Sequence, residues 1–167
     1  MPSRSPPLPG LALLACLAAG ACGYSLEQGE WTLSRDPQVA AQDTCGLLPA
    51  DGAVLSGRLV RMGAELRFSA ELEPLQTLPM FGRFKHSVAG EPEQFMLEGS
   101  VQDEDIVFNG AQCRIRFGQV ELHATVLDER TFEGLVTQRY EFNLNQGAGC
   151  PERCDVAVGY RAGWMGP

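Results

Sequence analysis

The sequence lacks the short motifs by which many enzymes and nucleotide-binding proteins are recognised. Its 167 residues contain no Gly-x-Ser-x-Gly elbow for a nucleophilic serine and no phosphate-binding loop that ends in Gly-Lys-Ser or Gly-Lys-Thr. Only two histidines occur, His86 and His123, and they lie far apart with no acid at the spacing of a ligand set. We therefore expect no catalytic residue, no metal site and no cofactor, and we expect that the protein is not an enzyme.

Positive charge is scarce. Thirteen Lys and Arg stand against 21 Asp and Glu, which gives a formal net charge of -8. Such a chain does not offer the basic surface that nucleic acid or anionic lipid requires, so we expect no nucleic-acid partner. Hydrophobic residues make up 44% of the chain, which excludes wholesale disorder and is enough for one domain with a core.

No apolar run is long enough to cross a membrane as a helix. The charge-free stretch from residue 10 to residue 23 falls short of the roughly 20 residues that a span needs. It follows a single positive charge, Arg4, and ends in Ala, Gly and Cys, which is the layout of a secretory signal. We expect residues 1–21 to be a signal peptide.

The end of this stretch, "AAGAC" at residues 18–22, resembles the lipobox of bacterial lipoproteins. In that family the cysteine receives a diacylglycerol and becomes the first residue after cleavage. The resemblance implies lipidation at Cys22, the lipid bilayer as a partner and a place in the bacterial cell envelope. Cys16 fits the common motif better but leaves too short an apolar core. Because Gly23 is not Asp, similarity to the sorting pattern of Gram-negative lipoproteins implies the outer membrane.

Four cysteines remain after Cys22, namely Cys45, Cys113, Cys150 and Cys154. An even number in an exported chain favours two disulfides. Zinc is the alternative, but close cysteine spacing occurs only once, at Cys150 and Cys154.

A hairpin predicted from the pattern of strands suggests how the cysteines pair. If Val126 lies opposite Thr131 and a bulge occurs at Gly118, then Cys113 lies opposite residue 144 or 145, a few residues from Cys150. We therefore predict the disulfides Cys113–Cys150 and Cys45–Cys154. Two other patterns stay open: Cys45–Cys113 with Cys150–Cys154, and Cys45–Cys150 with Cys113–Cys154.

Apolar and polar residues alternate along most of the chain, which predicts strands with one buried face. The expected fold is all-β, an antiparallel meander that forms an up-and-down barrel or a barrel-like sandwich, with one short helix over residues 36–46.

We expect residues 22–35 to form a lipidated tether that includes a first strand, and residues 36–167 to form a single β domain. The acidic trio Asp103, Glu104 and Asp105 is expected in a solvated turn. The predicted strands cover residues 54–61, 64–73, 80–88, 94–101, 105–109, 113–126, 132–144 and 155–161, and the predicted inner face includes Trp31, Phe68, Leu122, Val136, Tyr140, Phe142, Val158 and Tyr160.

The first expected strand opens with Gly29-Glu30-Trp31, and an arginine, Arg161, lies near the last strand. This combination resembles lipocalins, in which Gly-x-Trp opens the barrel and the Trp ring packs against a late Arg. The family's Thr-Asp-Tyr segment is absent, and the simpler interpretation is that Trp31 fills one end of a β domain.

Two functions follow as hypotheses. The first is a tethered binding or structural module of the cell envelope, for an apolar ligand or a protein partner. The alternative is an envelope-associated hydrolase whose site does not show in the sequence.

Overall fold

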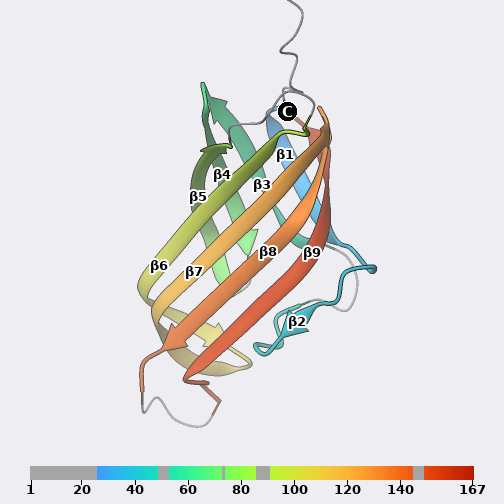
Figure 1. Cartoon of the computed structure of the whole chain (residues 1–167). Coiled ribbons are helices and arrows are strands. Elements are labelled where there is room, and N and C mark those ends of the chain that lie inside the picture. Colours follow the sequence, from blue (N-terminus) through green and yellow to red (C-terminus); the bar gives the residue numbers. More distant parts are fainter. Residues whose placement is uncertain (1–25, 49–52, 73, 86–90, 145–148) are drawn as a thin grey trace, which may run out of the picture.

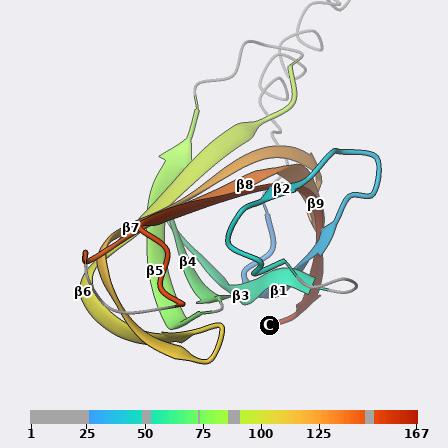
Figure 2. The ribbon, with the colours of Figure 1, turned by 90° about the horizontal axis from the view of Figure 1, so that it is seen from below.

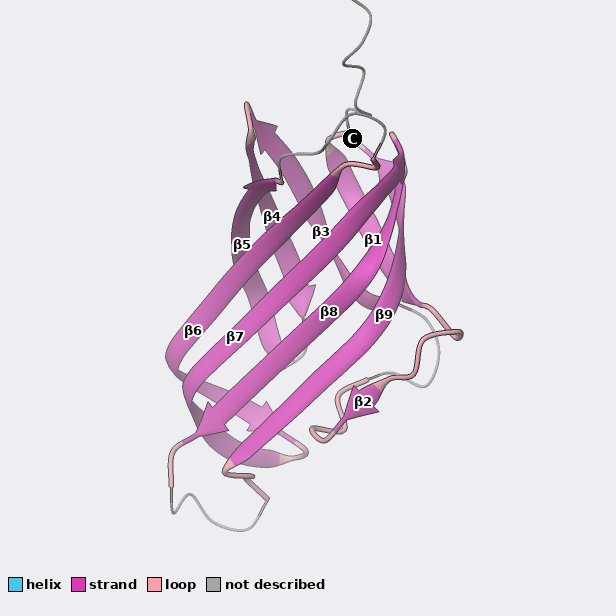
Figure 3. Ribbon diagram, in the orientation of Figure 1, coloured by secondary structure: helices cyan, strands magenta, loops and turns pink. Residues whose placement is uncertain are grey.

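The computed structural model describes residues 26–48, 53–72, 74–85, 91–144 and 149–167, and all regular secondary structure in these residues is β-strand. The strands form an antiparallel meander that closes on itself because β1 pairs with both β3 and β9 (Figures 1 and 3). The fold is therefore a closed barrel. Its long strands are β1 (Gly29–Arg35), β3 (Ala53–Met62), β4 (Glu65–Leu72), β5 (Leu75–Phe84), β6 (Gln94–Phe108), β7 (Ala111–Asp128), β8 (Thr131–Phe142) and β9 (Arg153–Gly166). Because β1 belongs to the barrel, the β domain begins before the expected boundary at residue 36.

The helix predicted over residues 36–46 is wrong. Asp36 instead ends β1 in a tight turn, in which its carboxylate accepts a hydrogen bond from the Gln38 N–H at 2.8 Å. The chain then returns to the edge of β9 as the short strand β2 (Gln42–Asp43), opposite Ala157 and Val156. Edge pairing satisfies backbone groups of β9 that a helix would leave without partners, and so tertiary contacts override the local helix signal.

The turn predicted at Asp103, Glu104 and Asp105 is also wrong, because β6 continues through these residues as one bent strand. At the bend, Asp103 has a φ of +53°, and the inward positions change from odd to even numbers. β7 bends beside it, with an extra residue, Arg116, relative to β8. The bulge therefore lies two residues before the predicted position, Gly118.

Gly118 has a packing role instead of forming the bulge. A Cβ atom at this position would lie 3.0 Å from the Tyr140 ring and 2.8 Å from Val101. The bent part of the β6–β7 hairpin curves at the lower end of the barrel, as the view from below shows (Figure 2).

The inward side chains form one hydrophobic cluster that occupies the barrel, and every residue predicted on the inner face is buried. Near the end at which β1 begins, the Trp31 ring lies 4.8 Å from that of Phe132, which lies 5.1 Å from Phe95 and 6.0 Å from Tyr160. Arg161 is exposed on the outer face of β9, between two inward residues, so it does not pack on Trp31 as the lipocalin resemblance implied.

The two predicted disulfides are both present, so the predicted pairing is confirmed. The Cα atoms of Cys45 and Cys154 are 5.0 Å apart, and those of Cys113 and Cys150 are 5.7 Å apart. Cys113 is the third residue of β7 and Cys154 the second residue of β9. Both strands begin at the lower end of Figure 1, whereas β1 begins and β9 ends at the upper end.

Candidate functional site

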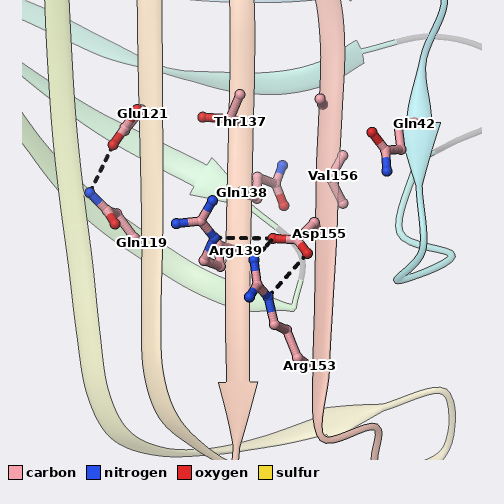
Figure 4. Close-up of a pocket in the computed structure, with 10 residues that line it drawn as sticks. Gln42, Gln119, Glu121, Thr137, Gln138, Arg139, Arg153, Asp155 and Val156 are labelled. Atoms are coloured by element: carbon pink, nitrogen blue, oxygen red, sulfur yellow. Dashed lines mark hydrogen bonds and ion pairs between the residues drawn. The ribbon is translucent and has the colours of Figure 1, made fainter.

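A shallow polar pocket of about 300 Å³ lies on the outer face of β7, β8 and β9, beside β2 (Figure 4). The alternation of strand side chains sends the odd-numbered lining residues of these strands outward, and the register aligns them across strands. Gln119 lies opposite Arg139, which lies opposite Asp155, and in the adjacent row Glu121 lies opposite Thr137. The remaining lining residues are Gln42, Gln138, Arg153, Val156 and Ala157.

Two guanidinium groups share one carboxylate at the centre of this pocket. Arg139 Nε donates to Asp155 Oδ1 at 3.2 Å, and Arg153 donates to both carboxylate oxygens at 3.2 and 3.3 Å. Partial burial acts to raise the pKa of Asp155, but the hydrogen bonds from Arg153 and Arg139 outweigh it and hold that pKa below its ordinary value. Asp155 is therefore ionised at neutral pH, and the three groups together carry one net positive charge.

The backbone of Asp155 is clamped from the β2 side. The Thr44 N–H donates to the Asp155 carbonyl at 2.9 Å, and the Asp155 N–H donates to Thr44 Oγ1 at 2.8 Å. The disulfide Cys45–Cys154 joins the residue after Thr44 to the residue before Asp155. The floor of the pocket is thus held by hydrogen bonds and by a covalent bond.

The opposite side of the pocket is acidic. Gln119 Nε2 donates to Glu121 Oε1 at 2.8 Å, and His123 Nε2 lies 3.6 Å from Glu121 Oε2. His123 is half-exposed on the polar face of β7, which is where the sequence places it. The lining offers positively charged hydrogen-bond donors and negatively charged acceptors. Among the lining residues there is no cysteine or serine nucleophile. Its chemistry suits the binding of a polar group.

The acidic trio predicted in a turn lies at the bend of β6 and is exposed. Arg114 forms ion pairs with Asp105 at 3.2 Å and with Asp103 at 4.0 Å. In the described part of the chain, no three His, Cys, Asp or Glu side chains are placed to hold a metal ion together. Cys22, His86 and the predicted signal peptide over residues 1–21 lie outside the described residues.

Arg139, Arg153 and Asp155 do not stand out in the sequence as residues of a site. Their alternation with buried residues marks them as outward-facing, but their meeting depends on the register of β8 against β9. The strand pattern leaves the register of this pair open, whereas that of the β7–β8 hairpin is predicted to within about one residue of the observed one.

Comparison of the sequence with protein-family models finds no match, and comparison with curated proteins finds no significant similarity. Within the described ranges, no helix has the length and hydropathy needed to cross a membrane.

Proposed function

We propose that this protein is an exported, lipid-anchored module of the bacterial cell envelope that binds through the outside of its barrel. The observation that carries the proposal is the pairing of all four cysteines after Cys22 in two disulfides. Disulfides persist in oxidising compartments outside the cytosol, which agrees with a secretory signal. The resemblance of residues 18–22 to a lipobox supplies the anchor, and by the same resemblance the membrane is the outer one.

The covalent connection also suggests an orientation. Gly29, the first residue of β1, follows Cys22 by seven positions in the chain. A chain of that length spans at most about 25 Å, so an acylated Cys22 keeps the upper end of the barrel in Figure 1 near the bilayer. The end with the disulfides then points away from the membrane.

Binding through the outer face is favoured because large side chains occupy the inner face. The polar pocket around Arg139, Arg153 and Asp155 lies on that outer face and is held in place by the Cys45–Cys154 disulfide. We accordingly do not extend the proposal to an apolar ligand carried in the interior. Titration with a fluorescent fatty acid tests this part: we expect no saturable binding, and saturable binding of one molecule per barrel would contradict it.

Cell fractionation of a Cys22→Ser variant tests the anchor. We expect the variant to move from the membrane fraction to the soluble fraction, or to accumulate as an uncut precursor, because the acyl chains are lost with the thiol. Cys16→Ser is the matched control and should stay in the membrane. Mass spectrometry of the mature N-terminal peptide should show the lipid mass, and a mature chain without that mass would refute the anchor.

A further inference from the structure

The barrel wall has an open seam between β5 and β6. These strands pair only through residues 81–84 and 95–98. Residues 75–80 of β5 pair with β4 on one edge, and residues 99–108 of β6 pair with β7 on one edge, but their facing edges have no strand partner among the described residues. Figure 1 shows β6 diverging from β5 towards the lower left.

A cleft of about 790 Å³ follows this seam, open to solvent and lined by residues of β5, β6 and β7. Its apolar residues include Leu75, Leu78, Ile106 and Val107, of which Val107 is 60% exposed. The seam does not lead into the interior, because Leu78 packs so closely over Gly99 that a Cβ there would lie 2.9 Å from its Cδ2 atom. Side chains thus fill the inside of the seam, while the backbone edges are accessible from outside.

Two features of the sequence keep the strands apart. Pro79 has no N–H to donate and, like proline generally in sheets, suits a strand edge without a partner. The bend at Asp103 then carries the second half of β6 away from β5. Unpaired edges of this kind accept an added strand, and natural proteins usually protect them. Here the acidic residues 103–105 of β6 lie beside the open edge but do not cover it.

The charge of the edge selects the occupant. Residues 94–108 of β6 contain four acids and no Lys or Arg. Asp103 and Asp105 share one cation, Arg114, whereas exposed Glu104 has no ion-pair partner in the described part of the chain. A second copy of this chain, at a formal net charge of -8, is repelled by such an edge. A segment with Lys or Arg on its outward side is attracted.

We propose that the seam between β5 and β6 binds an extended, basic segment of a partner protein, which adds as a strand to the open edge. Six residues of β5, 75–80, face the seam, and at about 3.3 Å per residue they accommodate a segment about 20 Å long. Its inward side chains are apolar, to match Leu75 and Ile106, and its outward ones are basic. The proposal rests on the proposed function only in taking the partner to be another envelope protein.

Fluorescence anisotropy with the full chain, produced through its own export signal and purified in mild detergent, tests this. The probe is a labelled, terminally blocked eight-residue peptide of alternating Lys and Val. We expect saturable binding that weakens with salt. A peptide with Glu in place of Lys, and a Lys–Val peptide N-methylated at alternate residues, should each bind at least about tenfold more weakly. Equal binding of the N-methylated peptide would rule out strand addition.

Variants of the seam locate the binding. Ser100→Trp fills the cleft and should weaken binding at least about tenfold, and Glu104→Lys should weaken it about threefold to tenfold. The matched controls Ser34→Trp and Glu65→Lys make the same changes at exposed positions of β1 and β4 outside the cleft, and they should bind within about twofold of the wild type. Melting temperatures of all four variants verify folding. Binding that Ser100→Trp does not weaken in the folded variant would overturn the proposal.

Sedimentation velocity distinguishes the main competing occupant. We expect the chain to be monomeric in the same detergent. A dimer that disappears in Ser100→Trp would assign the seam to a second copy and overturn the proposal. If the fractionation experiment refuted the lipid anchor, these peptide results would be unchanged. Failure of the proposed function can therefore be distinguished from failure of the proposed strand addition.

Discussion

The two ends of the barrel are held together by different means. At the end where β1 begins, Trp31, Phe95, Phe132 and Tyr160 form a buried aromatic cluster, and the Trp31 Nε1–H donates to the Glu27 carbonyl at 3.1 Å. At the other end the strands of β5 and β6 separate, β6 and β7 bend, and both disulfides occur. At the first end, where strand pairing is continuous, side-chain packing is enough to hold the strands together. Covalent bonds reinforce the second end, where pairing is interrupted.

The largest expected effect comes from removing the disulfides in turn. The chain-entropy model gives about 5 kcal/mol for Cys45–Cys154, which spans 109 residues, and about 4 kcal/mol for Cys113–Cys150, which spans 37. We expect the double variant Cys45→Ala/Cys154→Ala to lose more free energy of unfolding than Cys113→Ala/Cys150→Ala, as measured by urea denaturation. The reverse order would show that local strain, and not loop length, governs this end.

Truncation of the aromatic cluster is expected to cost nearly as much. Phe132→Ala should lower the free energy of unfolding by about 3–5 kcal/mol, because its ring contacts three other rings of the cluster. Leu135→Ala on the same strand, where the side chain is 38% exposed, is the control and should change stability by about 0.5 kcal/mol or less. A small effect of Phe132→Ala would contradict the view that packing holds this end.

Alkaline pH should affect both ends to a smaller extent. Burial raises the pKa of Tyr160, whose hydroxyl donates to the His123 carbonyl, and that of Tyr140, whose hydroxyl donates to Gln138. The raised pKa means that the unfolded state ionises first. Stability is therefore fully present below about pH 10 and decreases as the pH rises above it. Urea midpoints between pH 9 and about pH 11 should fall less steeply in Tyr160→Phe and in Tyr140→Phe than in the wild type.

Acid should produce the smallest effect, and at the end with the disulfides it acts through Asp155. Arg153 and Arg139 hold the pKa of Asp155 below its unfolded value, so its contribution to stability is present above about pH 4 and is lost as the pH falls further. Asp155→Asn should flatten the dependence of the urea midpoint on pH between about pH 5 and pH 3. Glu65→Gln, at an exposed acid that forms no ion pair with the described residues, should follow the wild type. An unchanged slope in Asp155→Asn would show that the two arginines do not stabilise the carboxylate.

Much of the fold could be predicted because strand periodicity is a local property. The alternation around Phe68 and Phe142 identifies their strands and their buried faces from the sequence alone. The register of the β7–β8 hairpin was predicted to within about one residue because its turn is short, and this placed Cys113 close to Cys150. The candidate pocket was not predicted, because Arg139 and Asp155 meet only through the register of β8 and β9, which a long connection joins.

The sequence by itself determined an all-β meander and the buried faces of the strands with clear alternation, and it favoured the observed pairing of the four cysteines over two other patterns that it left open. Only the tertiary structure decided that residues 36–46 lie along the edge of β9 as a turn and strand, that β6 bends at Asp103 without ending, and that β5 and β6 part to leave a seam. The reason is that closing a barrel imposes its own requirements on backbone pairing and curvature. Those requirements arise between strands distant in the chain, and they outweigh the local preferences of Asp-Pro or of an acidic segment.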